Sequence, residues 1–179
     1  MGKAKQATMN FITKTLAGIT ALSSVVLPVS ANSFEYHTEL ARAVASTGTD
    51  VLINVSACKT RDAHGWYHAA RGQLVICQEN ATGSDMVAWT EEDLDTLRHE
   101  AHHLVQDCMD NALDGNLDTV YVEPAELIGT VLTKQQVLSI LEWYEDAPKA
   151  RQVHELEAFS VAIMNDPLEQ VADIKKYCF

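Results

Sequence analysis

The stretch TEEDLDTLRHEAHHLVQDC, residues 90–108, predicts a long helix that carries an unusual group of histidines. Thr90 can cap this helix, and the three acids that follow it stand where the helix dipole favours negative charge. We expect the helix to begin after Thr90 and to end near Gly115. Its apolar residues recur at helical spacing and form one stripe for the core, made of Leu94, Leu97, Ala101, Leu104, Val105, Cys108 and Ala112.

Two histidines in this helix stand four residues apart and fall away from the apolar stripe. A helix brings side chains at i and i+4 to one edge, so His99 and His103 can share one metal ion. Glu100 lies about 100° further round the helix, too far to be a ligand but near enough to accept a proton from a metal-bound water. This H-E-x-x-H pattern predicts a zinc site with its own general base. We expect His102 either to support the metal ligands without binding the metal itself or to lie at the surface.

Strand and turn signals place the remaining elements around that helix. Two β-branched runs, residues 51–58 and 72–79, predict neighbouring strands, with residues 66–71 extending the second one backwards. The other segments with helical character are residues 34–45, a short piece at 125–128, and residues 134–145, 149–164 and 167–179. The sequence therefore predicts an α+β fold, in which a short antiparallel β-sheet precedes a long helix and a C-terminal helical subdomain.

Residues 1–31 have the pattern of a secretory signal peptide. Three lysines precede an apolar run without acids, and the run ends in the small-x-small triplet Val29-Ser30-Ala31. Cleavage there would leave residues 32–179 as one domain, long enough to fold without a structural metal. An uncleaved anchor or an N-terminal helix is the alternative. We therefore expect an exported protein, located in a periplasm, a lumen or the exterior.

The chain is acidic, with a formal net charge of −12 that becomes −15 without the three leader lysines. Such a charge repels nucleic acid and anionic membrane surfaces, and it favours cationic substrates or divalent metal ions. We therefore expect no nucleic-acid partner, and no stable membrane insertion once the leader is removed.

Four cysteines follow the leader without any C-x-x-C pair, which argues against a cysteine-ligated zinc or a thioredoxin-like centre. An even number of cysteines in an exported chain predicts disulfides. Cys58 and Cys77 each end one of the two β-like runs, so we expect them to pair, and by elimination Cys108 pairs with Cys178. Four buried thiols are the alternative, because spacing alone does not prove connectivity.

A catalytic zinc needs a third protein ligand. In the extended pattern H-E-x-x-H-x-x-G-x-x-H, the glycine and the last histidine would stand at Gln106 and Met109, so that pattern fails here. The run VHELEAFSVA, residues 153–162, instead offers Glu155 and Glu157 from a later helix. The residues alone leave the third ligand open between these two glutamates.

Together, residues 98–103 (RHEAHH) and the E-x-x-A from Glu155 to Ala158 resemble the gluzincin metallopeptidases. In that family an H-E-x-x-H helix is completed by a glutamate from a downstream helix. The resemblance implies a small zincin-like domain in which Ala158 lets the two helices approach. The zinc ligands that it implies are His99, His103 and Glu155.

The same resemblance implies roles for further positions. The strand at residues 73–77 would be the edge to which an extended peptide adds by main-chain hydrogen bonds. Phe159 stands where several such families have Asp or Asn. An oxyanion stabiliser is expected near the zinc, and the candidates are Tyr144, His154 and Tyr121. Asp107, one turn after His103, is a candidate for orienting a ligand imidazole.

We expect from these features an exported, zinc-dependent metallopeptidase that cleaves peptides or flexible protein segments, with Glu100 as general base. One alternative is a zinc-binding domain without hydrolytic activity. Glu100 argues against it, because metal binding alone does not need that residue. The other alternative is an acidic exported interaction domain whose histidines bind no metal, and such a domain would fold normally in the presence of a chelator.

Overall fold

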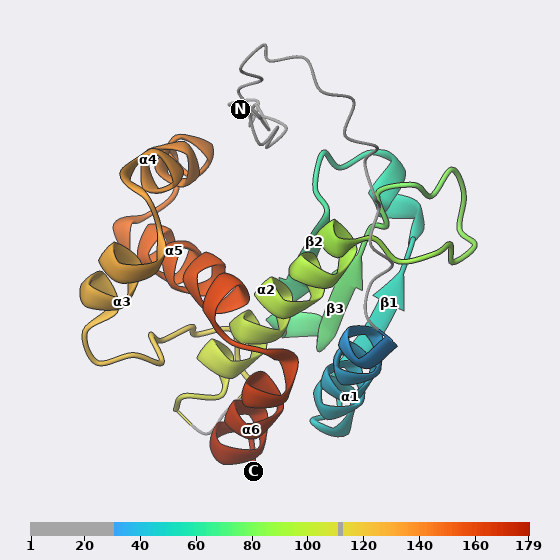
Figure 1. Cartoon of the computed structure of the whole chain (residues 1–179), viewed down its shortest axis with the longest axis horizontal. Coiled ribbons are helices and arrows are strands. Elements are labelled where there is room, and N and C mark those ends of the chain that lie inside the picture. The colour runs from blue at the N-terminus through green and yellow to red at the C-terminus, as the bar shows by residue number, and fades with distance from the viewer. Residues whose placement is uncertain (1–30, 111–112) are drawn as a thin grey trace, which may run out of the picture.

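Six α-helices and a three-stranded sheet form the described part of this computed structural model, which covers residues 31–110 and 113–179 (Figure 1). The predicted α+β class is confirmed. The expected leader lies outside the described residues, apart from Ala31 at the start of α1. The elements are α1 (Ala31–Ser46), β1 (Asp50–Ile53), β2 (Gly65–His68), β3 (Gln73–Ile76), α2 (Glu91–Asp107), α3 (Pro124–Val131), α4 (Lys134–Trp143), α5 (Lys149–Met164) and α6 (Pro167–Tyr177).

Three helices begin where the sequence provides a capping box, in which the cap residue and the third helical residue each bond the other's backbone. The pairs are Thr90 with Asp93 in α2, Thr133 with Gln136 in α4, and Asp166 with Glu169 in α6. α2 ends at Asp107, earlier than the predicted end near Gly115. The chain turns back there, and the Asp107 carboxylate accepts a hydrogen bond of 2.7 Å from the Gly115 N–H.

The sheet is mixed, with the strand order β1-β3-β2. β1 pairs parallel with β3, whereas β2 pairs antiparallel with it. The predicted neighbours β1 and β3 do pair, but the expected antiparallel arrangement is wrong for them. Residues 66–71 do not extend β3 backwards. They form most of a separate strand, β2, and a 3-10 turn that ends at Gly72 in the left-handed conformation, and this turn reverses the chain.

β3 is the central strand, so the expectation that residues 73–77 form a free edge is wrong. Its three apolar residues are buried, since strands flank it on both sides. The edges belong to β1 and β2. β2 lies directly against α2, because a Cβ built on Gly65 would come within 2.6 Å of Thr96 Cγ2. An edge strand therefore runs beside the helix that carries the histidines.

Two apolar cores lie on opposite sides of a polar layer. Figure 1 shows the sheet and α1 on one side of α2, and α3, α4 and α5 on the other. The predicted apolar stripe of α2 is buried from Leu94 to Cys108, and Ala112 lies outside the described residues. The first core contains Leu40, Val44, Leu74, Ile76, Leu97, Leu104, Val105 and Ile174, and the second contains Ile128, Leu132, Ile140 and Leu156. The polar layer lies between α2 and α5, the two helices that carry the residues of the predicted metal site.

Both predicted disulfides are present. Cys58 pairs with Cys77, which joins the segment after β1 to the end of β3. Cys108 pairs with Cys178, which joins the end of α2 to the end of α6. Among the described residues, no helix is both long and apolar enough to cross a membrane. The second disulfide thus fixes the C-terminal helix against the helix that carries the site.

Candidate metal centre

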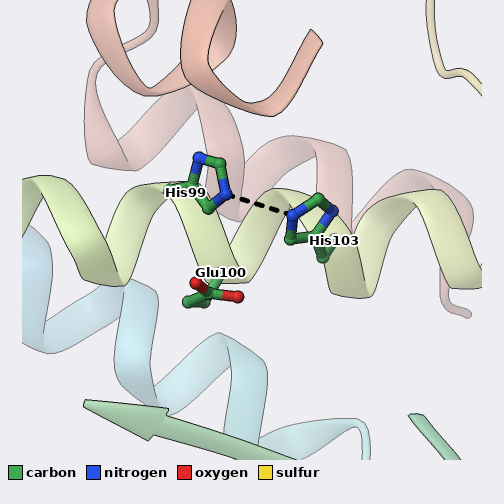
Figure 2. Close-up of side chains that lie close together, drawn as sticks. All are labelled: His99, Glu100 and His103. Atoms are coloured by element: carbon green, nitrogen blue, oxygen red, sulfur yellow. Dashed lines mark hydrogen bonds between the residues drawn. The ribbon is translucent and has the colours of Figure 1, made fainter. Parts of the chain in front are cut away.

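Three side-chain atoms meet between α2 and α5. Nε2 of His99 and Nε2 of His103 lie 3.1 Å apart, and Oε2 of Glu155 lies 3.3 Å from each of them. Figure 2 shows the two histidine rings facing each other on one side of α2. All three residues are buried, with exposed fractions of 8%, 4% and 1%. The structure therefore brings His99 and His103 together with Glu155, the glutamate that the gluzincin resemblance implies.

The spacing of these atoms suits one metal ion. Zinc bonds of 2.0–2.1 Å in a tetrahedral site place the ligand atoms about 3.3–3.4 Å apart, close to the observed separations of 3.1 and 3.3 Å. Two imidazole nitrogens and one carboxylate oxygen are also a donor set that zinc accepts. Glu100 lies beside the two histidines, with a carboxylate oxygen within 4.8 Å of one ring nitrogen of each. The cluster can therefore hold a metal ion.

Gln106 determines which nitrogen of His103 faces the cluster. Its Nε2 donates to the carbonyl oxygen of His154 and to Oε1 of Glu157, each at 3.1 Å, so Oε1 of Gln106 is the atom 2.7 Å from His103 Nδ1. An amide oxygen can only accept, hence Nδ1 carries a proton and donates. Nε2 of neutral His103 then directs its lone pair at the cluster, which is the form of imidazole that binds a metal.

The other oxygen of Glu155 is held by a cation. Nε and Nη2 of Arg151 lie 2.9 and 2.8 Å from Oε1, and the hydroxyl of Tyr144 also hydrogen-bonds the carboxylate. Burial by itself raises the pKa of Glu155, but the charges and hydrogen bonds of His103 and His99 hold it well below its usual range. Glu155 is therefore an anion that directs one oxygen at the histidines.

In the metal-free chain, His103 holds a proton in this cluster. Burial by itself lowers the pKa of His103, but the charge of Glu155 and the hydrogen bond to it raise the pKa to about 9. A metal ion would have to displace this proton, because both bind the imidazole. The surroundings of the cluster therefore favour a bound positive charge.

Glu100 points toward the sheet, apart from the two rings (Figure 2). The backbone N–H of Tyr67, in β2, donates to its carboxylate. Burial raises the pKa of Glu100, and the charges of His99 and His103 oppose this rise. β2 can come this close because Gly65 has no side chain, as a Cβ there would lie 3.3 Å from Glu100 Cγ. A buried carboxylate beside the cluster is suited to taking up and releasing a proton.

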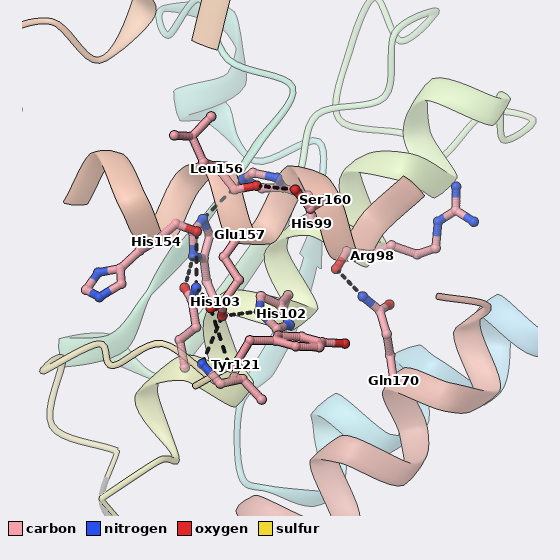
Figure 3. A network of polar contacts seen from close by, with 12 residues as sticks. Arg98, His99, His102, His103, Tyr121, His154, Leu156, Glu157, Ser160 and Gln170 are labelled. Carbon is pink, nitrogen blue, oxygen red and sulfur yellow. Dashed lines mark hydrogen bonds and ion pairs between the residues drawn. The ribbon is translucent and has the colours of Figure 1, made fainter. Parts of the chain in front are cut away.

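Glu157 has a different role from Glu155. It is fully buried and accepts hydrogen bonds that tie α5 to α2 and to the segment before α3. Figure 3 shows its side chain reaching toward His102 and the backbone at Tyr121. Its partners are His102 Nε2 at 2.8 Å, Gln106 Nε2 at 3.1 Å, Val120 N at 2.9 Å and Tyr121 N at 3.4 Å. Glu155 is thus the glutamate that faces His99 and His103, and His102 is a buried partner of Glu157.

His99 is oriented by packing. Its ring lies against Phe159, with ring centroids 4.3 Å apart, and edge-on to His103 at 4.7 Å. Nδ1 of His99 is buried and has no hydrogen-bond partner among the described residues. Phe159 stands where the gluzincin resemblance leads one to expect Asp or Asn. An apolar ring therefore orients the first histidine where a hydrogen-bond acceptor would be expected.

Tyr144 is the oxyanion candidate that the fold brings to the cluster. It follows α4 directly, and burial together with the nearby Glu155 raises the pKa of its hydroxyl. Tyr121 instead hydrogen-bonds Asn165. The ring of His154 points away from the other side chains drawn in Figure 3. A catalytic role for His154 therefore stays a prediction.

The sequence reasoning missed Gln106 and Arg151. Asp107, a candidate for orienting a ligand imidazole, instead accepts hydrogen bonds from the Tyr67 hydroxyl and the Gly115 N–H, both at 2.7 Å. Gln106 stands three residues after His103, and Arg151 stands four residues before Glu155. Side chains three or four residues apart lie on one face of a helix, so these spacings by themselves indicate that Gln106 can contact His103 and that Arg151 can contact Glu155.

The chain belongs to the family described as a domain of unknown function, DUF8637, whose model matches residues 11–179. No curated protein matches the chain, and no solved structure matches it either.

Proposed function

We propose that this chain is an exported, zinc-dependent peptidase of gluzincin type. One observation carries the proposal: Nε2 of His99, Nε2 of His103 and Oε2 of Glu155 form a buried triangle with sides of 3.1 and 3.3 Å. Two of these ligands come from an H-E-x-x-H helix and the third from a later helix, as in the gluzincins. Three protein ligands leave a fourth tetrahedral position open, which is typical of catalytic zinc sites.

Zinc in this position would supply a Lewis acid, which lowers the pKa of water toward neutrality and polarises a carbonyl group. We assign the role of general base to Glu100. Burial raises the pKa of its carboxyl group above that of an exposed glutamate, so the group holds a proton more readily. Glu100 can therefore take a proton from the attacking water and pass it to the leaving amine.

Tyr144 can supply a hydrogen-bond donor for the carbonyl oxygen, on which negative charge develops during the reaction, once its hydroxyl turns from Glu155 to the substrate. Its raised pKa keeps the hydroxyl protonated at neutral pH. A peptide substrate would lie along the edge of β2, because this strand borders Glu100 and β3 is paired on both sides. The substrate would thus pass beside Glu100, whose carboxylate contacts this strand.

Export is consistent with the two disulfides, since such bonds persist in oxidising compartments. The charge pattern of the first 31 residues supports a leader. Together these features favour a protein that acts in a periplasm, a lumen or the exterior.

The variant Glu100→Gln tests the proposal, because it removes the base and keeps the three ligands. We expect its zinc content to be unchanged and its cleavage of a mixed peptide library, followed by mass spectrometry, to fall by about 10²–10⁴-fold. Glu91→Gln, an exposed acid in the first turn of the same helix, is the matched control and should retain activity. Bound zinc without cleavage by the unaltered chain would favour a non-catalytic zinc domain. Absence of zinc would favour an interaction domain.

A further inference from the structure

We infer that Arg151 is a positioning residue that restricts Glu155 to a single metal-binding oxygen. The inference rests on the proposed metal centre. A carboxylate can bind a metal through one oxygen or through both. Binding through both would use the position that a hydrolytic site needs for water and substrate. A residue that holds one oxygen back therefore determines whether the site stays open.

The contacts of Glu155 divide its two oxygens between different partners. Oε2 faces His99 and His103 at 3.3 Å from both Nε2 atoms. Oε1 is bound by Nε and Nη2 of Arg151 at 2.9 and 2.8 Å. Two donors on a rigid guanidinium fix this oxygen in position as well as in charge. Rotating Oε1 toward the histidines would break both contacts.

The position of Arg151 is unfavourable for the helix itself. α5 begins with Lys149 and Arg151 in its first turn, without an acid there and without a side-chain cap. Cations at a helix N-terminus oppose the helix dipole. The pair also runs from Arg151 to Glu155, which is the less favourable order for oppositely charged residues four apart. Arg151 weakens its own helix, yet it binds the buried carboxylate of Glu155. The proposed metal centre therefore explains its position better than the stability of α5 does.

The backbone that carries Arg151 is held by its neighbour. Nε2 of Gln152 donates to the carbonyl oxygens of Tyr144 and Ala147, at 2.9 and 3.3 Å. This contact joins the end of α4 to the start of α5. It also holds Tyr144 beside the carboxylate that Arg151 binds. The first turn of α5 is therefore a fixed platform next to Glu155.

Cobalt in place of zinc tests the inference by spectroscopy. Visible absorption by Co²⁺ is strong in four-coordinate sites and weaker when a fifth ligand binds. We expect Arg151→Met to bind cobalt with a clear loss of band intensity per bound ion, because Oε1 becomes free to bind. Lys149→Met removes a cation from the same turn and should keep the spectrum of the unaltered chain. Arg151→Lys, which lacks the two-nitrogen fork, should resemble Arg151→Met.

The outcomes separate this inference from the proposed function. An unchanged spectrum in Arg151→Met, at full cobalt occupancy, would overturn the role of Arg151 and leave the metal centre standing. Failure of the unaltered chain to bind cobalt or zinc would contradict the metal centre, and the role of Arg151 with it. Thermal unfolding of each variant checks that it folds, which is expected because the Arg151 side chain is 54% exposed.

Discussion

Oε1 of Gln106 lies 2.7 Å from Nδ1 of His103, so the residue that orients the second histidine belongs to the same helix. Gln106 is fully buried, and its amide nitrogen reaches α5 at His154 O and Glu157 Oε1. One side chain therefore sets the proton on His103 and joins the helix that carries the two histidines to the helix that carries Glu155. Partners of this kind tune metal binding as well as holding the ligands in place.

Replacing Gln106 should weaken metal binding. We expect Gln106→Leu to lower the zinc affinity by about 10–100-fold, because His103 loses the acceptor that holds its proton on Nδ1. Competition with a chromophoric chelator measures this affinity. Gln170→Leu is the matched control, since Gln170 is also buried but donates to the Arg98 carbonyl, on the side of α2 that meets α6. Equal losses of affinity in the two variants would show that Gln106 acts only through stability.

The two glutamates of α5 should separate binding from folding. Glu155→Gln is expected to lose the bound zinc, because it removes the anionic ligand. Glu157→Gln is expected to keep zinc but to lose about 1–3 kcal/mol of folding free energy, because a neutral amide replaces the carboxylate that accepts the buried hydrogen bonds of His102, Gln106 and Val120. Zinc analysis and urea unfolding of both variants check this. Zinc loss from Glu157→Gln alone would reverse the assignment of the ligand.

Gly65 should be intolerant of a methyl group. A Cβ there would lie 2.6 Å from Thr96 Cγ2 and 2.7 Å from the Val75 carbonyl oxygen, so β2 must move away from α2. We expect Gly65→Ala to cost about 1–3 kcal/mol of stability, measured by urea unfolding. Gly129→Ala, at a helical position with open space around it, should instead be neutral or stabilising. Equal changes in stability in the two variants would contradict a tight contact between β2 and α2 at Gly65.

The metal-free chain should lose stability in mildly alkaline solution. The pKa of His103 is raised from 6.5 to about 9, so the folded state favours its protonated form. This contribution is complete below pH 6.5 and disappears as the pH rises through 9. Saturation with zinc should remove the alkaline loss, because the metal replaces the proton. Urea unfolding between pH 6 and 9.5, with chelator or zinc, tests this, and a flat chelator series would contradict the proton on His103.

Local features of the fold were readable from the sequence. Capping residues marked the start of α2, and helical periodicity predicted which side of it enters the core. Strand direction was not readable, because alternation of apolar residues reports which faces are buried and not which way a neighbour runs. The turn at Gly72 separates β2 from β3 and reverses the chain between them. β2 is therefore antiparallel to β3, and the sheet is mixed because β1 is parallel to β3.

The residues of the sequence do not by themselves decide whether Glu155 or Glu157 faces the two histidines. The two residues lie about 200° apart around a helix, so the orientation of α5 against α2 decides which one meets the histidines. That orientation depends on packing of the second core and on the partners of Glu157, which lie far apart in the chain. The resemblance to the gluzincins pointed to Glu155, and Glu155 is the glutamate that lies beside the two histidines.

The most direct test of the metal centre is the zinc content of the purified mature chain, measured beside that of Glu155→Gln. The proposed site predicts about one zinc ion per unaltered chain and little or none in a variant that still unfolds cooperatively. Absence of zinc from the unaltered chain, or equal zinc in both proteins, would contradict a site built from His99, His103 and Glu155.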